Sequence, residues 1–594
     1  MPKRVVPRDS SRLFTEMRAN TILEGGIKMI DFKKEVVNSI HNAVDAMDAD
    51  EIYRLIEIPP SYDLGDYAFP CFKLAKTFRK APNLIAEELA DKIGTSEYFE
   101  KVENKGPYLN FFINKVKLTE TALKEIAEKK EQFAATDIGQ GRNIIVEFSS
   151  PNIAKPFHIG HIRTTVIGNA LYKLCKYLGF NAIAINHLGD YGTQFGMLIA
   201  AYKKWGDKET IEKDPINELL KLYVKFNAEA EKDESLRDEA RYWFKELEDN
   251  NEEAVQLWQW IRDVSLKEFN RVYNLLNIKF DSYAGESFYS DKMGRVIDEL
   301  EAKGLLKESE GAKIVDLEEY DMPPALIQKR DGSTLYITRD IAAAIYRKEH
   351  YDFYKNIYVV ASQQNLHFKQ WIKVVELMGY DWANDCVHVP FGMVSLEDGT
   401  LSTRKGRVVF LEDVLNKAIE STRKIIEEKN PNLENKEEVA KQVGIGAVLF
   451  QELFNSRIKD YVFTWEKTLS FEGETGPYVQ YTHARANSLL EKGNFKLENE
   501  VDYSLLKEEE EVDLVRLLYN FPQIVLDAFE KYEPSFITRH VAEIAKTFNK
   551  FYNSCPILSV DEDLRKARLC LVYATKIAIK TGLELLGIEA PDKM

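Results

Sequence analysis

The chain has 594 residues, of which 45% are hydrophobic and 11% aromatic, and its formal net charge at pH 7 is −16. Length and composition predict about three or four domains with sizeable cores. The negative charge excludes general electrostatic attraction to nucleic acid, so any RNA contact has to use local basic patches.

Two further features favour a soluble cytoplasmic protein. No stretch approaches the roughly 18 consecutive apolar residues that a membrane helix needs, and no charged leader followed by an apolar core opens the chain. The five cysteines form no CxxC pair, which argues against a thiolate zinc site and a disulfide framework. We therefore expect a reducing compartment, no membrane association, no DNA partner and no structural metal.

The N-terminal part is predicted to contain one small domain. Residues 1–28 show little periodicity and are interpreted as an N-terminal extension, with a weak presequence as the alternative. Residues 29–138 alternate helical patterns, such as FKKEVVNSIHNAVDAM and NLIAEELADKI, with the short apolar run YLNFFIN. This alternation predicts an α+β domain.

Residues 139–414 carry the pattern of an α/β domain with a doubly wound parallel sheet. The apolar run NIIVEF (143–148) predicts a buried strand. Apolar residues then recur every fourth position up to a helix cap at Gly179, and AIAIN (182–186) predicts the next strand.

A second strand–helix–strand unit begins at IYVV (357–360) and returns with VHVPFGMV (387–394). The long segment between the two halves is rich in charge and helix-forming residues, and we expect a helical insertion around 200–330. From 415 to 594 no strand pattern is visible, and the remainder is predicted to be a helical bundle.

The loop SSPNIAKPFHIGH, residues 149–161, directly follows the first strand of this sheet. Phosphate groups bind at such a loop, where it opens onto a helix N-terminus. Gly160 lets a nucleotide approach the backbone closely. His158 and His161 supply donors for charge that develops on a phosphate, and Lys155 adds a positive charge. The loop therefore predicts a nucleotide site.

Other interpretations of the two histidines have less support. A zinc site lacks the HExxH glutamate and a third ligand nearby. Purely structural histidines are the common explanation for a single residue, but the strand before HIGH and the amphipathic helix after it argue for function. No GxxxxGK[ST] motif occurs, so a P-loop is not expected.

HIGH at 158–161 resembles the signature of the class I aminoacyl-tRNA synthetases and their nucleotidylyl-transferase relatives. Within that class the chain is similar to the arginyl-tRNA synthetases, from about residue 30 to its end. The similarity in order and spacing is carried by VEFSSPNIAKPFHIGHIRTT, HLGDYGTQFG, LYITRD, ASQQNLHFKQ and LSTRKGRVV, and further by GDYAFPCFKLAK, TGPYVQYTHAR and LLGIEAPDKM.

The resemblance implies a Rossmann-like, HIGH-type catalytic domain (139–414) between a domain that holds the tRNA elbow (29–138) and a helical anticodon-binding domain (415–594). It implies an arginine–tRNA ligase that converts L-arginine and ATP to arginyl-adenylate and diphosphate. The arginyl group then passes to the 3′-terminal adenosine of tRNA(Arg). Mg²⁺ is implied as the companion of ATP, and we expect a monomer.

By the same resemblance, the second signature loop LSTRKG should contact ATP and diphosphate. Relatives have KMSKS there, whereas this chain lacks the opening lysine, and the resemblance implies that Lys155 compensates. Two basic residues exposed to solvent are the alternative for this loop. The residues assigned to catalysis and ATP are Lys155, His158, Gly160, His161, Ser402, Arg404 and Lys405.

Recognition of arginine requires acidic partners, because a guanidinium carries five donors. By motif position, Glu286 and Asp340 are the carboxylates, and Tyr336 lies beside them. The residues assigned to the α-amino and carboxylate groups are Ser150, Pro151, Asn152, His161 and Gln364, with Glu147 nearby.

Contacts with tRNA are expected in the C-terminal part. Tyr478, Tyr481 and Arg485 match the family's tRNA-contacting segment, with core packing as the alternative. Residues 564–583 carry no acid and several basic side chains, and a stripe binding the tRNA backbone is predicted there, with a solvated helix face as the alternative. The stripe consists of Arg565, Lys566, Arg568, Lys576 and Lys580.

Two rival functions are weighed against the ligase. A small-molecule nucleotidylyl transferase would not need the long helical region after the second signature loop. An RNA-binding protein that has lost activity is disfavoured by the intact HIGH, Lys155 and Asp340.

Overall fold

The computed structural model describes residues 29–44, 47–330, 332, 334–396, 409–497 and 500–594. Contacts divide the chain into two compact units, neither of which is one contiguous segment. Unit 1 comprises Met1–Ala134, Thr482–Gln523 and His540–Thr581, and unit 2 comprises Ala135–Tyr481, Ile524–Arg539 and Gly582–Met594. The extension predicted at 1–28 lies outside the described residues. None of the described helices is long and apolar enough to cross a membrane.

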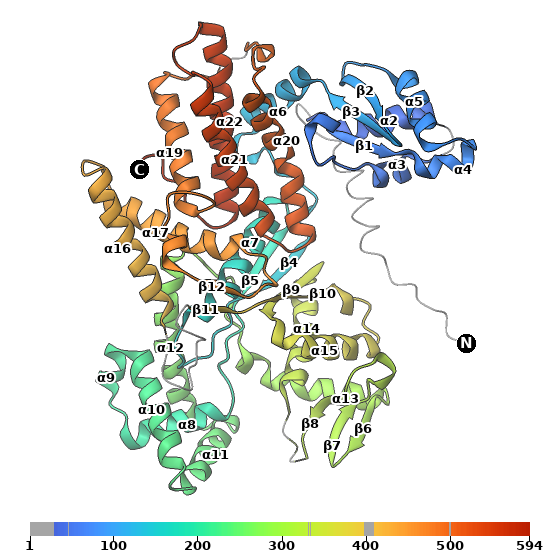
Figure 1. The fold of residues 1–594 in the computed structure, drawn as a ribbon. Helices are drawn as coiled ribbons and strands as arrows, with labels where there is room; N and C mark the ends of the chain where they lie inside the picture. Colours follow the sequence, from blue (N-terminus) through green and yellow to red (C-terminus); the bar gives the residue numbers. More distant parts are fainter. Residues whose placement is uncertain (1–28, 45–46, 331, 333, 397–408, 498–499) are drawn as a thin grey trace. The chain divides into compact units, whose positions relative to one another are not determined.

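The N-terminal part of unit 1 has the predicted α+β fold, with an antiparallel sheet in the order β1-β3-β2 (Figure 1). Side chains such as Phe69, Phe99 and Phe111 are fully buried there. The strands are β1 (Tyr67–Pro70), β2 (Phe99–Lys105) and β3 (Tyr108–Ile113). The helices are α2 (Phe32–Ala43), α3 (Ala49–Leu55), α4 (Leu74–Phe78), α5 (Pro82–Ile93) and α6 (Lys115–Lys129).

Unit 1 is completed by parts of the last four long helices of the chain. Arg516 of α20 forms a 2.9 Å ion pair with Asp66, and Phe521 packs against Phe133. These contacts join residues about 400 positions apart and explain why the unit is discontinuous. The four helices are α19 (Gly476–Lys492), α20 (Glu509–Glu530), α21 (Ser535–Ser554) and α22 (Glu562–Leu585).

Unit 2 is built on a four-stranded parallel sheet in the order β10-β9-β4-β5, which confirms the doubly wound prediction. The chain runs from β4 to β5 on one side and later adds β9 and β10 on the other. The switch point therefore lies at β4, directly before the HIGH loop. The strands are β4 (Asn143–Glu147), β5 (Asn181–Ile185), β9 (Lys355–Ala361) and β10 (Cys386–Phe391).

The predicted helix after the HIGH loop is α7 (Ile162–Tyr177). Its predicted apolar face is buried, and Gly179 follows its end with φ +80°. Gly168 allows the close approach of α7 to the sheet, because an added Cβ would lie 2.1 Å from Cβ of Phe148. Helices α14 (Tyr336–Tyr351) and α15 (Asn365–Leu377) complete the second half.

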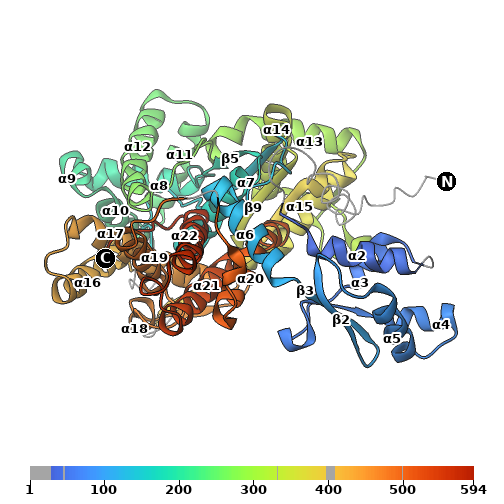
Figure 2. The same ribbon diagram turned by 90° about the horizontal axis from the view of Figure 1, so that it is seen from above.

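The insertion between the two halves is only partly helical. Helices α8 to α12 form a separate cluster in both views (Figures 1 and 2). The range predicted to be helical also contains a three-stranded antiparallel sheet, so that part of the prediction is wrong. Its strands have four residues each, too few for their alternation to be distinguished from a helical pattern.

The insertion's helices are α8 (Thr193–Trp205), α9 (Lys208–Lys213), α10 (Pro215–Ala230), α11 (Ser235–Glu248), α12 (Glu252–Leu275) and α13 (Met293–Ala302). Its strands are β6 (Leu306–Ser309), β7 (Ala312–Val315) and β8 (Ala325–Gln328).

The prediction that strands are absent after residue 415 is also wrong. β12 (Tyr461–Phe463) pairs in parallel with β11 (Val394–Leu396). With three residues, β12 gives no periodic signal. The other helices of this region are α16 (Leu411–Lys429), α17 (Lys436–Phe454) and α18 (Trp465–Thr468).

Candidate active site

The loop after β4 has an unusual backbone. Ser149, Ser150 and Ala154 adopt φ values of +71°, +48° and +59°. Residues other than glycine rarely occupy this left-handed region of backbone conformation. Those that do occupy it cluster at ligand-binding sites. The strain therefore marks this loop at the switch point as a candidate functional segment.

Hydrogen bonds to the loop after β5 keep the strained segment in place. Ile153 N donates to Gly189 O at 3.1 Å, and Gly189 N donates to Pro151 O at 3.1 Å. Ser149 Oγ lies 2.8 Å from the buried Tyr273 hydroxyl of α12. Backbone hydrogen bonds thus join the HIGH loop to the HLGDYG loop at the carboxyl ends of β4 and β5.

The backbone contacts both HIGH histidines and fixes the tautomer of His158. Gly160 N donates to His158 Nδ1 at 3.1 Å, and His158 N donates to His161 Nδ1 at 3.2 Å. A backbone N–H can only donate, so Nδ1 of His158 accepts and the proton of this neutral ring lies on Nε2. Nδ1 of His161 also lies 3.3 Å from His158 O, a contact that requires a proton on Nδ1. The His158 ring therefore offers an Nε2–H donor, and the two ring centroids are 4.0 Å apart.

The environment keeps these rings neutral. Burial lowers the pKa of His161 to about 3, and burial also lowers the pKa of His158. Burial lowers the pKa of Lys155, which the nearby Glu286 carboxylate opposes. The histidines can thus stabilise phosphate charge as fixed dipolar donors, without titrating near neutral pH.

The two carboxylates predicted for the guanidinium lie on neighbouring elements. Glu286 opens the 3₁₀ helix η5 (Glu286–Lys292), and Asp340 begins the second turn of α14. Burial raises the pKa of Glu286 to about 7; Arg339 acts in the opposite direction, and Asp340 adds to the rise. The structure therefore brings the two acids within electrostatic reach of one another.

Sequence reasoning missed the basic partners of these acids. Arg339 Nη1 lies 3.2 Å from Glu286 Oε2, and His367 Nε2 lies 2.5 Å from Asp340 Oδ2. Arg347, fully buried, lies 2.6 Å from Glu147 at the end of β4. These partners occur within or close to the quoted motifs, but no spacing rule connects them with the acids.

The remaining residues predicted for arginine differ in exposure. Pro151 is buried, whereas Asn152 and Gln364 are exposed, and Tyr336 is 67% exposed at the start of α14. Among the described residues, Ser150 Oγ is a buried polar atom without a hydrogen-bond partner. A buried hydroxyl without a partner is costly, so this oxygen fits a ligand contact.

Ser402, Arg404 and Lys405 of the second signature loop lie outside the described residues. The segments that flank them are joined to the HIGH segment: Ile159 N donates to Val409 O at 3.1 Å. On the other side Arg163, fully buried, pairs with Glu452 at 2.6 Å and donates to Gly392 O at 3.1 Å. One flanking segment therefore contacts the HIGH motif itself, and the other contacts the first turn of α7.

The predicted basic stripe on α22 is wrong for Arg568, and two further members have partners within unit 1. Arg568 is buried and pairs with Glu511 at 2.7 Å. Lys576 donates to Asn487 at 2.8 Å, and Lys580 pairs with Glu131 at 3.0 Å. Their charges serve contacts within unit 1.

The other residues predicted for tRNA binding are at least partly accessible. Tyr481 is 40% exposed, and Tyr478 is partly buried. Arg485 Nη1 donates to Asn549 at 2.5 Å, and Arg565 forms an ion pair with Glu562. Lys566 is partly buried on α22.

The site as a whole can hold a phosphate beside a cation. Two neutral imidazole donors and Lys155 lie at the switch point, and the carboxylates of Glu286 and Asp340 lie close by. Among the described residues no group of three or more histidine, cysteine or acidic side chains could hold a metal ion. The arrangement fits activation of a cationic substrate by a nucleotide.

Comparisons with known proteins agree with this chemistry. Residues 122–465 match the family "tRNA synthetases class I (R), catalytic domain". Residues 31–113 match "Arginyl tRNA synthetase N terminal domain", and residues 479–594 match "DALR anticodon binding domain".

Whole-chain relatives point the same way. The arginine–tRNA ligases of Halothermothrix orenii and Clostridioides difficile are 66% and 62% identical over 566 residues, which cover 95% of this chain and all of each relative. The solved structure of the Thermus thermophilus arginyl-tRNA synthetase is 26% identical, with a TM-score of 0.77. The matched region covers 95% of this chain and all of the Thermus thermophilus chain.

Proposed function

This chain belongs to the arginyl-tRNA synthetases. From that premise we propose which of its side chains bind each substrate and which contribute to catalysis in an arginine–tRNA ligase. The predicted family and activity are thereby confirmed. The reaction consumes ATP: a carboxylate oxygen of arginine attacks the α-phosphorus, diphosphate leaves, and a ribose hydroxyl of the tRNA terminus then displaces AMP. The two rival functions are not favoured.

Glu286 and Asp340 receive the guanidinium of arginine in this proposal, with Tyr336 beside it. The observation that carries the assignment is the pair of acids from η5 and α14, close enough for Asp340 to affect the pKa of Glu286. A guanidinium needs several acceptors at once, and two carboxylates from different elements supply them.

The strained loop after β4 and the 3₁₀ helix η7 (Ser362–Gln364) bind the α-amino and carboxylate groups of arginine in this proposal. The unpartnered Ser150 Oγ supports this placement. Glu147 provides negative charge at the end of β4, balanced by Arg347. The proposed set is Glu147, Ser150, Pro151, Asn152, His161 and Gln364.

The α-phosphate lies against His158 and His161, whose ring N–H groups donate to its non-bridging oxygens. Gly160 leaves room for the nucleotide, and Lys155 adds a cation to the same phosphate region. Fixed donors aimed at developing charge stabilise the transition state more than the ground state. Ser402, Arg404 and Lys405 are assigned to ATP and diphosphate by motif position alone.

Mg²⁺ enters this scheme with ATP. The described residues offer no cluster of three or more metal-ligating side chains, and Mg²⁺ commonly binds through substrate phosphates. The ion would screen the phosphate charge while His158, His161 and Lys155 orient the nucleotide.

We propose that three parts of the chain bind different parts of tRNA(Arg). Residues 29–138 would hold the elbow, residues 139–414 the acceptor end, and residues 415–594 the anticodon. Tyr481 is 40% exposed, which suits stacking on an unpaired base. The proposed contacts are Tyr478, Tyr481, Arg485, Arg565 and Lys566. We further propose a cytoplasmic monomer.

The test combines two assays on the purified full chain. Aminoacylation of tRNA(Arg) with each amino acid should give product only with arginine, and ATP–diphosphate exchange should require arginine together with tRNA. Glu286→Gln and Asp340→Asn should each raise KM for arginine while KM for ATP stays nearly constant. Exchange with another amino acid and not with arginine would overturn the specificity.

A further inference from the structure

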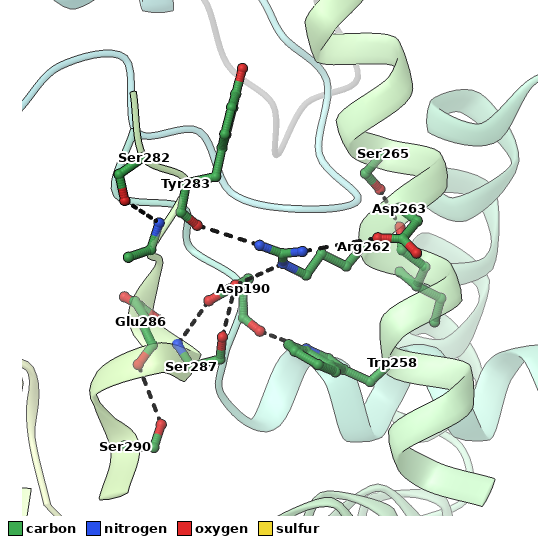
Figure 3. Close-up of polar contacts among 12 residues, drawn as sticks. Asp190, Trp258, Arg262, Asp263, Ser265, Ser282, Tyr283, Glu286, Ser287 and Ser290 are labelled. Atoms are coloured by element: carbon green, nitrogen blue, oxygen red, sulfur yellow. Dashed lines mark hydrogen bonds and ion pairs between the residues drawn. The ribbon is translucent and has the colours of Figure 1, made fainter. Parts of the chain in front are cut away.

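Asp190 of the HLGDYG loop is a buried carboxylate for which the proposed function has no role. It is completely inaccessible to solvent, although it lies next to the candidate arginine site. Its carboxylate accepts three hydrogen bonds: from Ser287 N to Oδ1 at 2.8 Å, from Ser287 Oγ to Oδ2 at 2.9 Å, and from Arg262 Nε to Oδ2 at 3.1 Å (Figure 3). A buried acid with these partners is used for positioning rather than for contact with substrate.

The partners of Asp190 come from two elements. Ser287 belongs to η5, directly after Glu286, whereas Arg262 belongs to α12 of the insertion. Trp258, one turn before Arg262, donates its indole N–H to Asp190 O at 2.7 Å. Figure 3 shows Asp190 between these two elements. The helix α12 therefore fixes Asp190, and Asp190 fixes the start of η5.

The backbone around Glu286 is held by the same loop. Leu188 O accepts from Glu286 N and from Asp190 N, each at 2.9 Å. An added Cβ at Gly285 would lie 2.6 Å from Leu188 O and 2.7 Å from Asp190 Oδ1. The contact is thus too close for any side chain at position 285, and Glu286 is bound on both sides to residues 188–190.

We propose that Asp190 is a positioning residue that sets the location of the Glu286 carboxylate, and thereby the enzyme's affinity for the guanidinium of arginine. The inference rests on the proposed role of Glu286. Its physical basis is the precision that ion pairing needs: a displacement of the order of 1 Å can cost about a hundredfold in rate or affinity. Because Arg262 of α12 donates to Asp190, the insertion also restrains the position of Glu286 in the substrate pocket.

The first test is Asp190→Asn in the full-length enzyme. An amide has one acceptor oxygen, so it cannot accept from Ser287 N on one oxygen and Arg262 Nε on the other. We expect KM for arginine to rise at least about tenfold, with KM for ATP within about twofold of the parent value. Asp263→Asn makes the same chemical change beside Arg262, at an exposed carboxylate 3.9 Å away, and should leave both constants nearly unchanged.

A double variant separates positioning from an independent effect. If Asp190 acts through Glu286, Asp190→Asn combined with Glu286→Gln should show the arginine KM of Glu286→Gln alone, within about twofold. Multiplying effects would overturn the inference, as would an equal loss of arginine and ATP affinity in Asp190→Asn.

The same experiment distinguishes failure of the inference from failure of the proposed site. An unchanged arginine KM in Glu286→Gln would remove Glu286 from the guanidinium site and the inference with it. A raised KM in Glu286→Gln with an unchanged KM in Asp190→Asn would overturn the inference alone.

If Asp190→Asn does not fold, Ser287→Ala decides the question. It deletes only the hydroxyl that donates to Asp190 and keeps the backbone hydrogen bond. We expect arginine KM to rise about fivefold, or about 1 kcal/mol, which is the size of one typical hydrogen bond. Ser282→Ala, a hydroxyl deletion in the preceding loop, is the matched control. Equal arginine KM values in Ser287→Ala and Ser282→Ala would overturn the inference.

Discussion

The raised pKa of Glu286 predicts that arginine binding depends on pH near neutrality. Burial raises the pKa of this carboxyl to about 7 in the protein without substrate, and only the ionised form attracts a guanidinium. Arginine binding stabilises the carboxylate, so at or below that pH binding must release a proton. Affinity therefore increases as pH rises through the pKa and then reaches a plateau.

The size of the effect follows from the same value. One pH unit below the pKa, about one carboxyl in ten is ionised, so KM for arginine should be roughly tenfold above its plateau, or about 1.4 kcal/mol. The assay is ATP–diphosphate exchange in the presence of tRNA, with KM for arginine and KM for ATP measured across this range.

Glu286→Gln supplies the decisive comparison, because glutamine cannot titrate. Its arginine KM should be high and nearly independent of pH across the range in which the parent changes. Titration calorimetry in two buffers of different ionisation enthalpy should detect the released proton in the parent alone. A flat KM profile for the parent, or the same slope in Glu286→Gln, would refute this account of the pocket.

Three further predictions concern the segments that support the site. Gly168→Ala should lower the free energy of unfolding by about 1–3 kcal/mol, because the new methyl would overlap Phe148; an unchanged thermal midpoint would contradict this packing. Glu452→Gln should cost about 3–5 kcal/mol in denaturant unfolding, because it leaves Arg163 buried without its counter-charge, and a cost below about 1 kcal/mol would show that water reaches the pair. Lys155→Ala should slow adenylate formation about a hundredfold with tRNA affinity nearly intact, and equal losses in both would make this lysine structural.

The parts of the fold that the sequence predicts are those with a long local signal. β4 and α7 were recognisable because a buried apolar run is followed by four-residue periodicity and a glycine cap. β6 to β8 and β12 were missed because strands of three or four residues give no such signal, and their pairing depends on residues distant in the chain.

The candidate site also contains features with a local sequence signal and features that depend on contacts in the folded chain. The sequence assigns His158, Gly160 and His161 to the site because they lie in one four-residue motif. It cannot predict the tautomer of His158, because this depends on a hydrogen bond within the folded loop. The stripe on α22 shows the converse error: its basic side chains share a segment without acids, yet Arg568 pairs with Glu511, 57 residues away. Local composition cannot reveal such a partner.

The acids of the proposed arginine site all have basic side chains as partners before substrate arrives. Arg339 pairs with Glu286, His367 with Asp340, and Arg347 with Glu147. Uncompensated buried carboxylates would be costly, and these partners reduce that cost in the free protein.

In the proposed site the incoming guanidinium would meet acids that already have basic partners, so the geometry of its hydrogen bonds, and not charge alone, has to favour its binding. A planar guanidinium can bond two carboxylates at once, whereas the ammonium of lysine is a point charge that cannot match two fixed acceptors equally well. If Glu286 and Asp340 bind the guanidinium as proposed, selectivity for arginine depends on how exactly the two carboxylates are placed. The proposed role of Asp190, which has no surface open to substrate, would then extend from affinity for arginine to the choice between arginine and lysine.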